Sequence, residues 1–310
     1  MNDAFVATRP IPVRAHSVDN PADILRFAAE ALSSGPAALA TLVEIRGGAA
    51  RALGAHVAVA ADGRFCGYVS GGCVEAAVAA EAFQAIAENR DRIVKFGEGS
   101  PFFDIALPCG GGVAVAIHVL REASMLYNVL SELANRRSAA LAYTPQSQSL
   151  VQVDKLPERS EWRENTFVSL YRPQTRVVIS GQTREAEAVR RIADASGYDV
   201  QLIENTQSRS ALDSIQIDPF TAVVLLHHDL DLETKILEAA LASQAFYIGA
   251  LGSTRTHRRR IERLRSRGIS SDCFDRIKAP IGLFGPTRDA TSLALSVLAD
   301  VAAARLEVFA

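Results

Sequence analysis

Two cysteines of this 310-residue chain lie beside glycine-rich bends, a combination that can bring a thiol and bare backbone against a ligand. Cys73 directly follows Ser70–Gly72 and begins an alanine-rich pattern that predicts a helix over Val74–Asn89. At a helix N-terminus the dipole and the unpaired N–H groups stabilise a thiolate. Cys109 repeats the arrangement ahead of Gly110–Gly112. Either cysteine alone is better explained as a small apolar filler, whereas two such bends together favour a ligand site.

The cysteines do not predict a structural zinc site, because paired short spacings are missing among Cys66, Cys73, Cys109 and Cys273. The first twenty residues lack the apolar stretch and the cleavage site of a secretory signal. We therefore expect a cytoplasmic protein with free thiols.

A second candidate site is the strand-to-helix turn at Gly249–Arg255, where Ser253 can cap the helix and free N–H groups can bind an anion. A series of arginines follows on the same predicted helix: Arg258, Arg259, Arg260, Arg263, Arg265 and Arg267. A solvated basic face and a surface for a phosphate or an acidic partner explain this series equally well.

A third candidate is the glycine turn Gly181–Ala186, which follows a strand, opens a helix and precedes the acidic Glu204 by about twenty residues. Thr183 stands where a dinucleotide-binding turn has its middle glycine. We therefore favour a Rossmann-type domain with weak or no nucleotide binding, which makes NAD(P) doubtful. His227 lies at a predicted strand end that could face a ligand or simply water. His118, within a predicted strand, is interpreted as a packed or edge residue and not as a ligand.

The elements that must position these bends differ between the two halves. The first half predicts a β-meander with helices over Ala22–Leu32 and Val74–Asn89; its strands are expected at Ala38–Ile45, Ala55–Ala60, Phe65–Val69, Ile93–Phe96 and Val113–Leu120. The second half alternates strands and helices, which is typical of a parallel sheet. The predicted fold class is α/β, with a glycine-rich α+β domain at residues 1–145, a junction at 146–172 and a Rossmann-like domain at 173–310.

Composition excludes several function classes. The 33 basic and 35 acidic residues give a net charge of −2, so no global field attracts nucleic acid or an anionic membrane. No apolar run approaches the roughly 18 residues that span a membrane. Binding must therefore be local.

Several segments together resemble the xanthine dehydrogenase accessory factor family, XdhC/CoxI. They are Ala40–Val43, Ser70–Glu75, Cys109–Gly112, Tyr247–Ser253 with Arg255–His257, and Ala279–Leu283. The resemblance implies an N-terminal XdhC/CoxI domain, a C-terminal Rossmann-like domain and a chaperone for the molybdenum cofactor (molybdopterin). Such a chaperone holds the cofactor through sulfuration and delivers it to a molybdenum hydroxylase such as xanthine dehydrogenase. It also implies a homodimer, an accessory factor rather than an enzyme, and leaves a cysteine desulfurase open as a second partner.

Under this interpretation we expect the two cysteine bends to converge around the cofactor. Cys109, and after it Cys73, are the expected neighbours of the molybdenum. The expected cofactor-binding residues are Ser70, Gly71, Gly72, Cys73, Glu75, Cys109, Gly110, Gly111, Gly112, Gly249, Gly252, Ser253 and Arg255. Two alternatives remain: an NAD(P)-binding oxidoreductase, and a scaffold that docks proteins during hydroxylase maturation through its arginine-rich helix.

Overall fold

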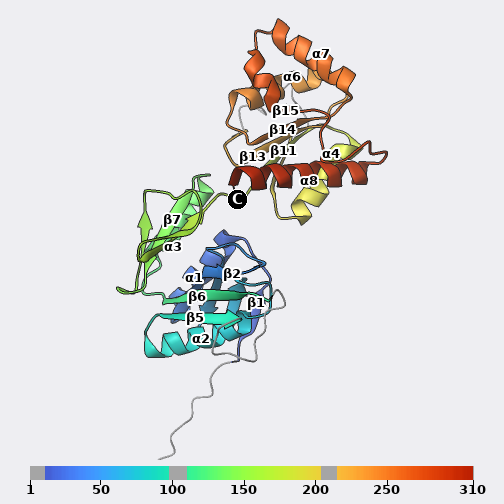
Figure 1. The fold of residues 1–310 in the computed structure, drawn as a ribbon. Coiled ribbons are helices and arrows are strands. Elements are labelled where there is room, and N and C mark those ends of the chain that lie inside the picture. The colour runs from blue at the N-terminus through green and yellow to red at the C-terminus, as the bar shows by residue number, and fades with distance from the viewer. Residues whose placement is uncertain (1–10, 98–109, 204–214, 310) are drawn as a thin grey trace, which may run out of the picture. The chain divides into compact units, whose positions relative to one another are not determined.

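The computed structural model describes residues 11–97, 110–203 and 215–309. It divides the chain into two compact units, Met1–Pro173 and Gln174–Ala310. Each unit has its own sheets and cores, which Figure 1 shows as the blue-to-green and the yellow-to-red parts of the ribbon. Cys109 and Glu204 lie outside the described residues.

The first unit is built on a six-stranded sheet with the order β1-β4-β3-β2-β6-β5. Its strands are β1 (Val13–His16), β2 (Ala37–Arg46), β3 (His56–Ala60), β4 (Arg64–Gly67), β5 (Arg92–Gly97) and β6 (Gly112–Val119). The predicted meander is confirmed, since β2, β3 and β4 pair as antiparallel neighbours. The apolar run of β2 is buried from Ala37 to Val43, as expected of a strand covered on both faces.

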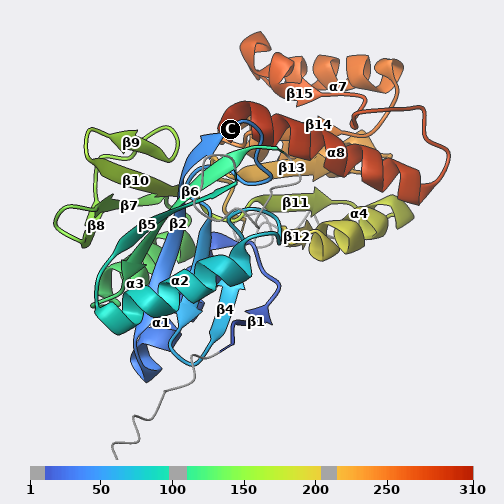
Figure 2. The same cartoon turned by 60° about the horizontal axis from the view of Figure 1, so that its bottom comes forward.

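Helices cover both faces of this sheet. The first unit contains α1 (Pro21–Ser34), α2 (Glu75–Glu88) and α3 (Ser124–Ala134). Asn20 caps α1, because its side chain accepts a hydrogen bond of 3.0 Å from the N–H of Ala22. Helix α2 packs on one face of the sheet, and α1 and α3 pack on the other (Figure 2). Strand β2 contributes Ala38 and Ala40 to the core under α2, and Leu39 to the core under α1 and α3.

A four-stranded antiparallel sheet completes the first unit, in the order β8-β7-β10-β9. Its strands are β7 (Ala139–Thr144), β8 (Ser149–Val153), β9 (Glu161–Arg163) and β10 (Thr166–Tyr171). Residues 146–172, which the sequence suggested as a junction, thus supply three of these strands. The strands are short and partly exposed, which explains their weak pattern. Tyr171 and Trp162 tie them to the first sheet, by hydrogen bonds to His56 Nε2 (2.8 Å) and to the carbonyl of Val43 (2.9 Å).

The second unit is a parallel five-stranded sheet in the order β12-β11-β13-β14-β15. Its strands are β11 (Arg176–Ser180), β12 (Asp199–Ile203), β13 (Thr221–Leu225), β14 (Tyr247–Ala250) and β15 (Ile277–Lys278). The strand order reverses between β11 and β13, and in such doubly wound sheets ligands bind at the carboxyl ends of the strands near this point. The predicted Rossmann-like parallel sheet is confirmed.

Two helical layers enclose this parallel sheet. The helices are α4 (Arg184–Ala195), α6 (Leu230–Ala242), α7 (Thr254–Ser266) and α8 (Ala290–Phe309), with a short 3-10 turn at Ser271–Arg276. Helices α4 and α8 share one core with the sheet, and α6 and α7 share the other, as Figure 1 shows. Among the described helices, none is both long and apolar enough to cross a membrane.

Candidate functional site

The glycine bends of the first unit lie along one edge of the six-stranded sheet. Strands β2, β4 and β5 run in the same direction, and β6 begins where they end, with Gly112 paired to both Arg46 and Gly97. We call this the glycine edge and define it by Arg46–Ala50, Ser70–Cys73 and Gly110–Gly112. The sheet thus brings two bends together that are about forty positions apart in the sequence.

The loop Arg46–Ala50 connects the two predicted bends. A Cβ atom placed on Gly71 would lie 3.3 Å from the Cβ of Ala50, and one placed on Gly47 would lie 3.4 Å from the Cα of Gly111. Each predicted bend therefore contacts the same third segment. The expected convergence of the Cys73 and Cys109 thiols stays a prediction, because Cys109 lies outside the described residues.

Glu75 holds the first bend in shape. Its side chain is fully buried, and one carboxylate oxygen accepts hydrogen bonds from the N–H of Val69 (3.0 Å), the N–H of Ser70 (2.8 Å) and the hydroxyl of Ser70 (2.9 Å). The Ser70 hydroxyl oxygen in turn accepts from the N–H of Cys73 at 3.2 Å. Burial alone would raise the pKa of Glu75, but these donors outweigh it and lower the pKa below its usual value.

This network leaves a specific set of groups for a ligand. Several N–H groups at the bend already donate to Glu75 or to Ser70. The loop therefore has a fixed shape but few free N–H groups with which to bind an anion. Gly71 and Gly72 have φ values of 152° and 119°, which disfavour any other residue. The Cys73 side chain is exposed as a free thiol at the start of α2. A ligand at this edge would therefore meet bare backbone and one sulfur atom.

Arg46 is a site residue that the sequence analysis missed. Its guanidinium lies against Gly112, where a Cβ atom would be 2.6 Å from Nη2. Gly111 is packed more tightly still, since its Cβ would lie 2.4 Å from the carbonyl oxygen of Arg46 and 2.9 Å from that of Gly48. The available signal was an arginine that ends a buried apolar strand directly before two glycines.

Arginines also lie beside Tyr68, two residues before the first bend. The Tyr68 ring lies 4.2 Å from the guanidinium carbon of Arg14 and 5.2 Å from that of Arg51, which forms an ion pair of 2.9 Å with Asp19. These arginines come from segments that the sequence did not associate with the bend. Arg14 also donates to the carbonyl of Gly67 at 3.0 Å, so both arginines have partners within the first unit.

The other described cysteines have different environments. Cys66 is buried in β4, and burial raises the pKa of its thiol to about 12, so it is an inert packing residue. Cys273 is partly exposed in the second unit. Within the described ranges, no three His, Cys, Asp or Glu side chains are grouped to hold a metal ion.

In the second unit, the Gly181–Ala186 turn follows β11, next to the point where the strand order reverses. Its polar groups are engaged in contacts with neighbouring residues. Thr183 caps α4 by accepting a hydrogen bond of 3.2 Å from the N–H of Ala186. Ser180 and His227 are buried and share a hydrogen bond of 2.8 Å, and burial lowers the pKa of His227. A Cβ on Gly181 would lie 3.0 Å from the carbonyl oxygen of Leu226. These contacts give each polar residue a local structural role.

The turn before α7 is exposed over Ser253–Arg255. Ser253 caps α7 as predicted, through a hydrogen bond of 3.3 Å from the N–H of Thr256, and Arg255 is exposed in the first turn. Gly249 lies inside β14, where a Cβ would come within 2.6 Å of Ile281, so close packing accounts for it. The predictions of cofactor contacts at Gly249, Gly252, Ser253 and Arg255 stay predictions.

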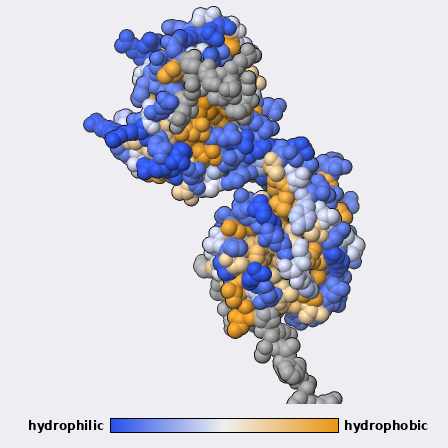
Figure 3. Space-filling view, turned by 180° about the vertical axis from the view of Figure 1, so that it is seen from behind, coloured by the Kyte–Doolittle hydropathy of each residue, from blue (hydrophilic) through white to orange (hydrophobic). Residues whose placement is uncertain are grey.

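Much of the arginine series on α7 is used inside the second unit. Arg260 is buried and donates to Glu233 of α6 from Nε (2.5 Å) and from Nη2 (3.1 Å). Two further ion pairs join the same helices, Arg263 with Asp231 and Arg267 with Glu238. These three arginines therefore hold α7 against α6. The exposed arginines left for a partner surface are Arg255, Arg258, Arg259 and Arg265. Figure 3 shows hydrophilic residues over much of the second unit on the side that it displays.

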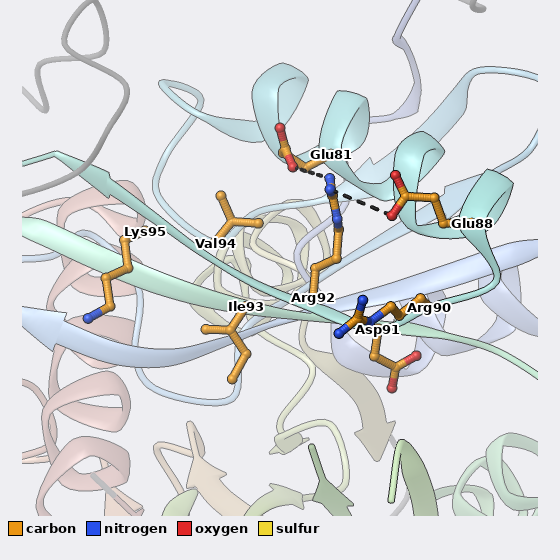
Figure 4. A pocket seen from close by; sticks show the side chains of 8 residues that line it. All are labelled: Glu81, Glu88, Arg90, Asp91, Arg92, Ile93, Val94 and Lys95. Atoms are coloured by element: carbon orange, nitrogen blue, oxygen red, sulfur yellow. Dashed lines mark hydrogen bonds and ion pairs between the residues drawn. The ribbon is translucent and has the colours of Figure 1, made fainter. Parts of the chain in front are cut away.

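Two surface hollows lie away from the predicted site residues. One of about 590 Å³ runs along β5 and α2, where Arg92 forms an ion pair of 2.7 Å with Glu81 and one of 3.7 Å with Glu88 (Figure 4). The other, of about 410 Å³, is partly lined by His118, whose Nδ1 lies 2.6 Å from Asp91. Neither is lined by a residue of the glycine edge.

Comparison with known proteins identifies the family. The model of the XdhC and CoxI family matches residues 31–97, and that of the XdhC Rossmann domain matches residues 177–301. The molybdenum cofactor insertion chaperone PaoD of Escherichia coli is 50% identical over 296 residues, which cover 95% of this chain and 92% of PaoD. The chain belongs to the XdhC and CoxI family. The predicted resemblance is confirmed.

Two further comparisons are more distant. The uncharacterized protein YqeB of Escherichia coli is 27% identical over 267 residues, which cover 86% of this chain and 43% of YqeB. A crystal structure described as a xanthine dehydrogenase from Bacillus halodurans has a TM-score of 0.74 at 21% identity, covering 93% of this chain and 96% of that one. At this identity the likeness supports the fold alone.

Proposed function

We propose that this XdhC/CoxI protein is a molybdenum cofactor chaperone, which holds the cofactor and delivers it to a molybdenum hydroxylase such as xanthine dehydrogenase. The observation that carries the proposal is the 50% identity to a molybdenum cofactor insertion chaperone along 95% of the chain. The glycine edge supports it, because its chemistry suits such a cargo.

The cargo has three kinds of group: a flat pterin with hydrogen-bonding edges, a phosphate, and a metal held by soft sulfur ligands. The glycine edge offers close backbone approach at Gly71, Gly72 and Gly110, a thiol at Cys73 and a guanidinium at Arg46. Each group of the cargo thus has a chemically suitable counterpart. In this proposal Cys109 and Cys73 lie nearest the molybdenum, and Glu75 acts by fixing the wall of the bend.

The proposal includes the partners and the setting. The client is a molybdenum hydroxylase, a cysteine desulfurase supplies sulfur to the bound cofactor, and the chaperone works as a homodimer in the cytoplasm. A carrier must release its cargo, so a few contacts from a rigid edge suit the task better than a metal cage of several side chains. Nucleic acid and membranes have no part in it.

The test is anaerobic purification from cells that make the cofactor, followed by molybdenum and pterin analysis. Wild-type protein should carry both, and Cys109→Ala should carry clearly less while unfolding at the same denaturant concentration. Cys273→Ala, a free cysteine of the second unit, is the matched control and should retain cargo like the wild type. Protein without molybdenum and pterin that also fails to activate a client hydroxylase would contradict the proposal.

A further inference from the structure

The Arg46 side chain has two hydrogen-bond donors for which the described residues offer no acceptor. Its Nε and Nη2 atoms are both covered from solvent, and neither has a hydrogen-bond partner among the described residues. The side chain as a whole is 34% exposed, so the exposed part lies elsewhere on it. A buried donor without a partner destabilises a protein, which makes two on one guanidinium notable.

These two atoms form one edge of the guanidinium. Nε–H and the adjacent Nη2–H are parallel donors, spaced to meet two oxygens of one carboxylate or phosphate. The buried Arg260 illustrates this geometry, since its Nε and Nη2 donate to the two oxygens of Glu233. In Arg46 the same pair of donors is prepared but unused.

The surroundings of Arg46 fix this donor pair in place. Gly112, which has no side chain, packs against the guanidinium, and Gly111 packs directly on the carbonyls of Arg46 and Gly48. The Oε1 atom of Glu44 lies 3.5 Å from Arg46 Nε, an ion pair without a hydrogen bond. An anionic oxygen therefore already stands close to the donors without satisfying them.

We propose that the Nε–Nη2 edge of Arg46 binds a phosphate oxyanion and that Glu44 is its internal competitor. The phosphate displaces the Glu44 carboxylate and accepts two charge-assisted hydrogen bonds. That this phosphate belongs to the molybdenum cofactor rests on the proposed function. Arg46 then anchors the cargo by its anionic end, while Glu44 keeps the anchor weak enough for release.

The test measures binding of inorganic phosphate and of molybdopterin released from a molybdenum enzyme, by calorimetry on the full chain. Arg46→Met keeps the apolar stem and should weaken both ligands about tenfold or more, whereas Arg46→Lys keeps the charge but not the donor pair and should also weaken them. Glu44→Gln should tighten both by a few fold. Arg64→Met is the matched control, because Arg64 is exposed, pairs with Asp62 and lies at the start of β4.

Stability separates an anchor from a structural arginine. Without ligand, Arg46→Met should melt at or above the wild-type temperature, because it removes unsatisfied donors. Equal binding by Arg46→Met and wild type, or a binding loss that follows a lowered melting temperature, would overturn the inference. If wild type binds phosphate through Arg46 but no molybdopterin, the proposed function fails while the oxyanion site stands; if it binds neither, both fail.

Discussion

Replacing Glu75 by alanine tests whether one carboxylate shapes the cysteine bend. The side chain is fully buried and accepts hydrogen bonds from the N–H groups of Val69 and Ser70 and from the Ser70 hydroxyl. Each buried donor left without a partner costs about 1–3 kcal/mol, and water entering the vacated space offsets part of this. We therefore expect Glu75→Ala to lower the free energy of unfolding of the first unit by about 3–5 kcal/mol.

The chain offers a convenient assay and control for this variant. Trp162, the one tryptophan of the sequence, lies in the first unit and donates to the carbonyl of Val43, so its fluorescence during urea unfolding reports that unit. Glu88→Ala at the other end of α2 removes an ion pair of 3.7 Å with Arg92 and an exposed hydrogen bond of 2.9 Å from Gln84 Nε2, and we expect a change below about 1 kcal/mol.

The charge of Glu75 adds a pH dependence to the same experiment. Its pKa is lower in the folded protein than the ordinary value of 4.5, so its stabilisation is complete above that pH and is lost as pH falls through the lowered pKa. Glu75→Gln should remove this dependence and cost about 2 kcal/mol, because an amide cannot accept from all three donors. A Glu75→Gln protein as stable as wild type would refute the role given to the carboxylate.

Three further predictions concern packing and buried charge. Burial lowers the pKa of His56 from its ordinary 6.5 to about 4, so between these two pH values the unfolded chain binds the proton more tightly than the folded one. In urea titrations the free energy of unfolding should therefore be about 2 kcal/mol lower at pH 5 than at pH 7. His56→Gln should lack this difference. Gly111→Ala should destabilise the first unit by about 3 kcal/mol, because its Cβ meets backbone carbonyls. Gly112→Ala should cost below about 1 kcal/mol, because its Cβ displaces only the end of the Arg46 side chain. The same displacement should weaken phosphate binding in calorimetry. Glu233→Ala leaves its arginine buried without a counter-ion and should cost about 3–5 kcal/mol by circular dichroism, against below about 1 kcal/mol for Glu238→Ala on the same helix; equal costs would contradict the buried pair.

Local patterns were sufficient to predict most elements of this fold. The alanine-rich run predicted α2, and the alternation of strands and helices predicted the parallel sheet of the second unit. These features depend on neighbouring residues, because a helix cap or an apolar period lies within one element. The family resemblance was likewise carried by contiguous motifs.

Contacts between distant residues could not be predicted in this way. The four-stranded sheet joins the first sheet through Trp162 and Val43, which are 119 positions apart, and short polar strands give no local signal of such a partner. The arginines of α7 illustrate the same limit. Their sequence predicts a basic face, but only the packing of α6 beside α7 shows that Arg260 is a buried ion-pair partner.

The site combines both cases, and this has a consequence for how cargo would be held. Sequence indicated the glycines and Cys73, but not that Glu75 and Ser70 consume the N–H groups of the bend. A bend with free N–H groups would bind a phosphate by itself, whereas a bend whose N–H groups are satisfied adds little affinity beyond shape and one sulfur. The affinity for an anion must then come from a separate group, and Arg46 offers two donors at the glycine edge that no described residue accepts from. In this arrangement the bend supplies the shape of the site and Arg46 supplies the positive charge. Glu44, which competes for Arg46, can therefore adjust how tightly the cargo is held without disturbing the bend.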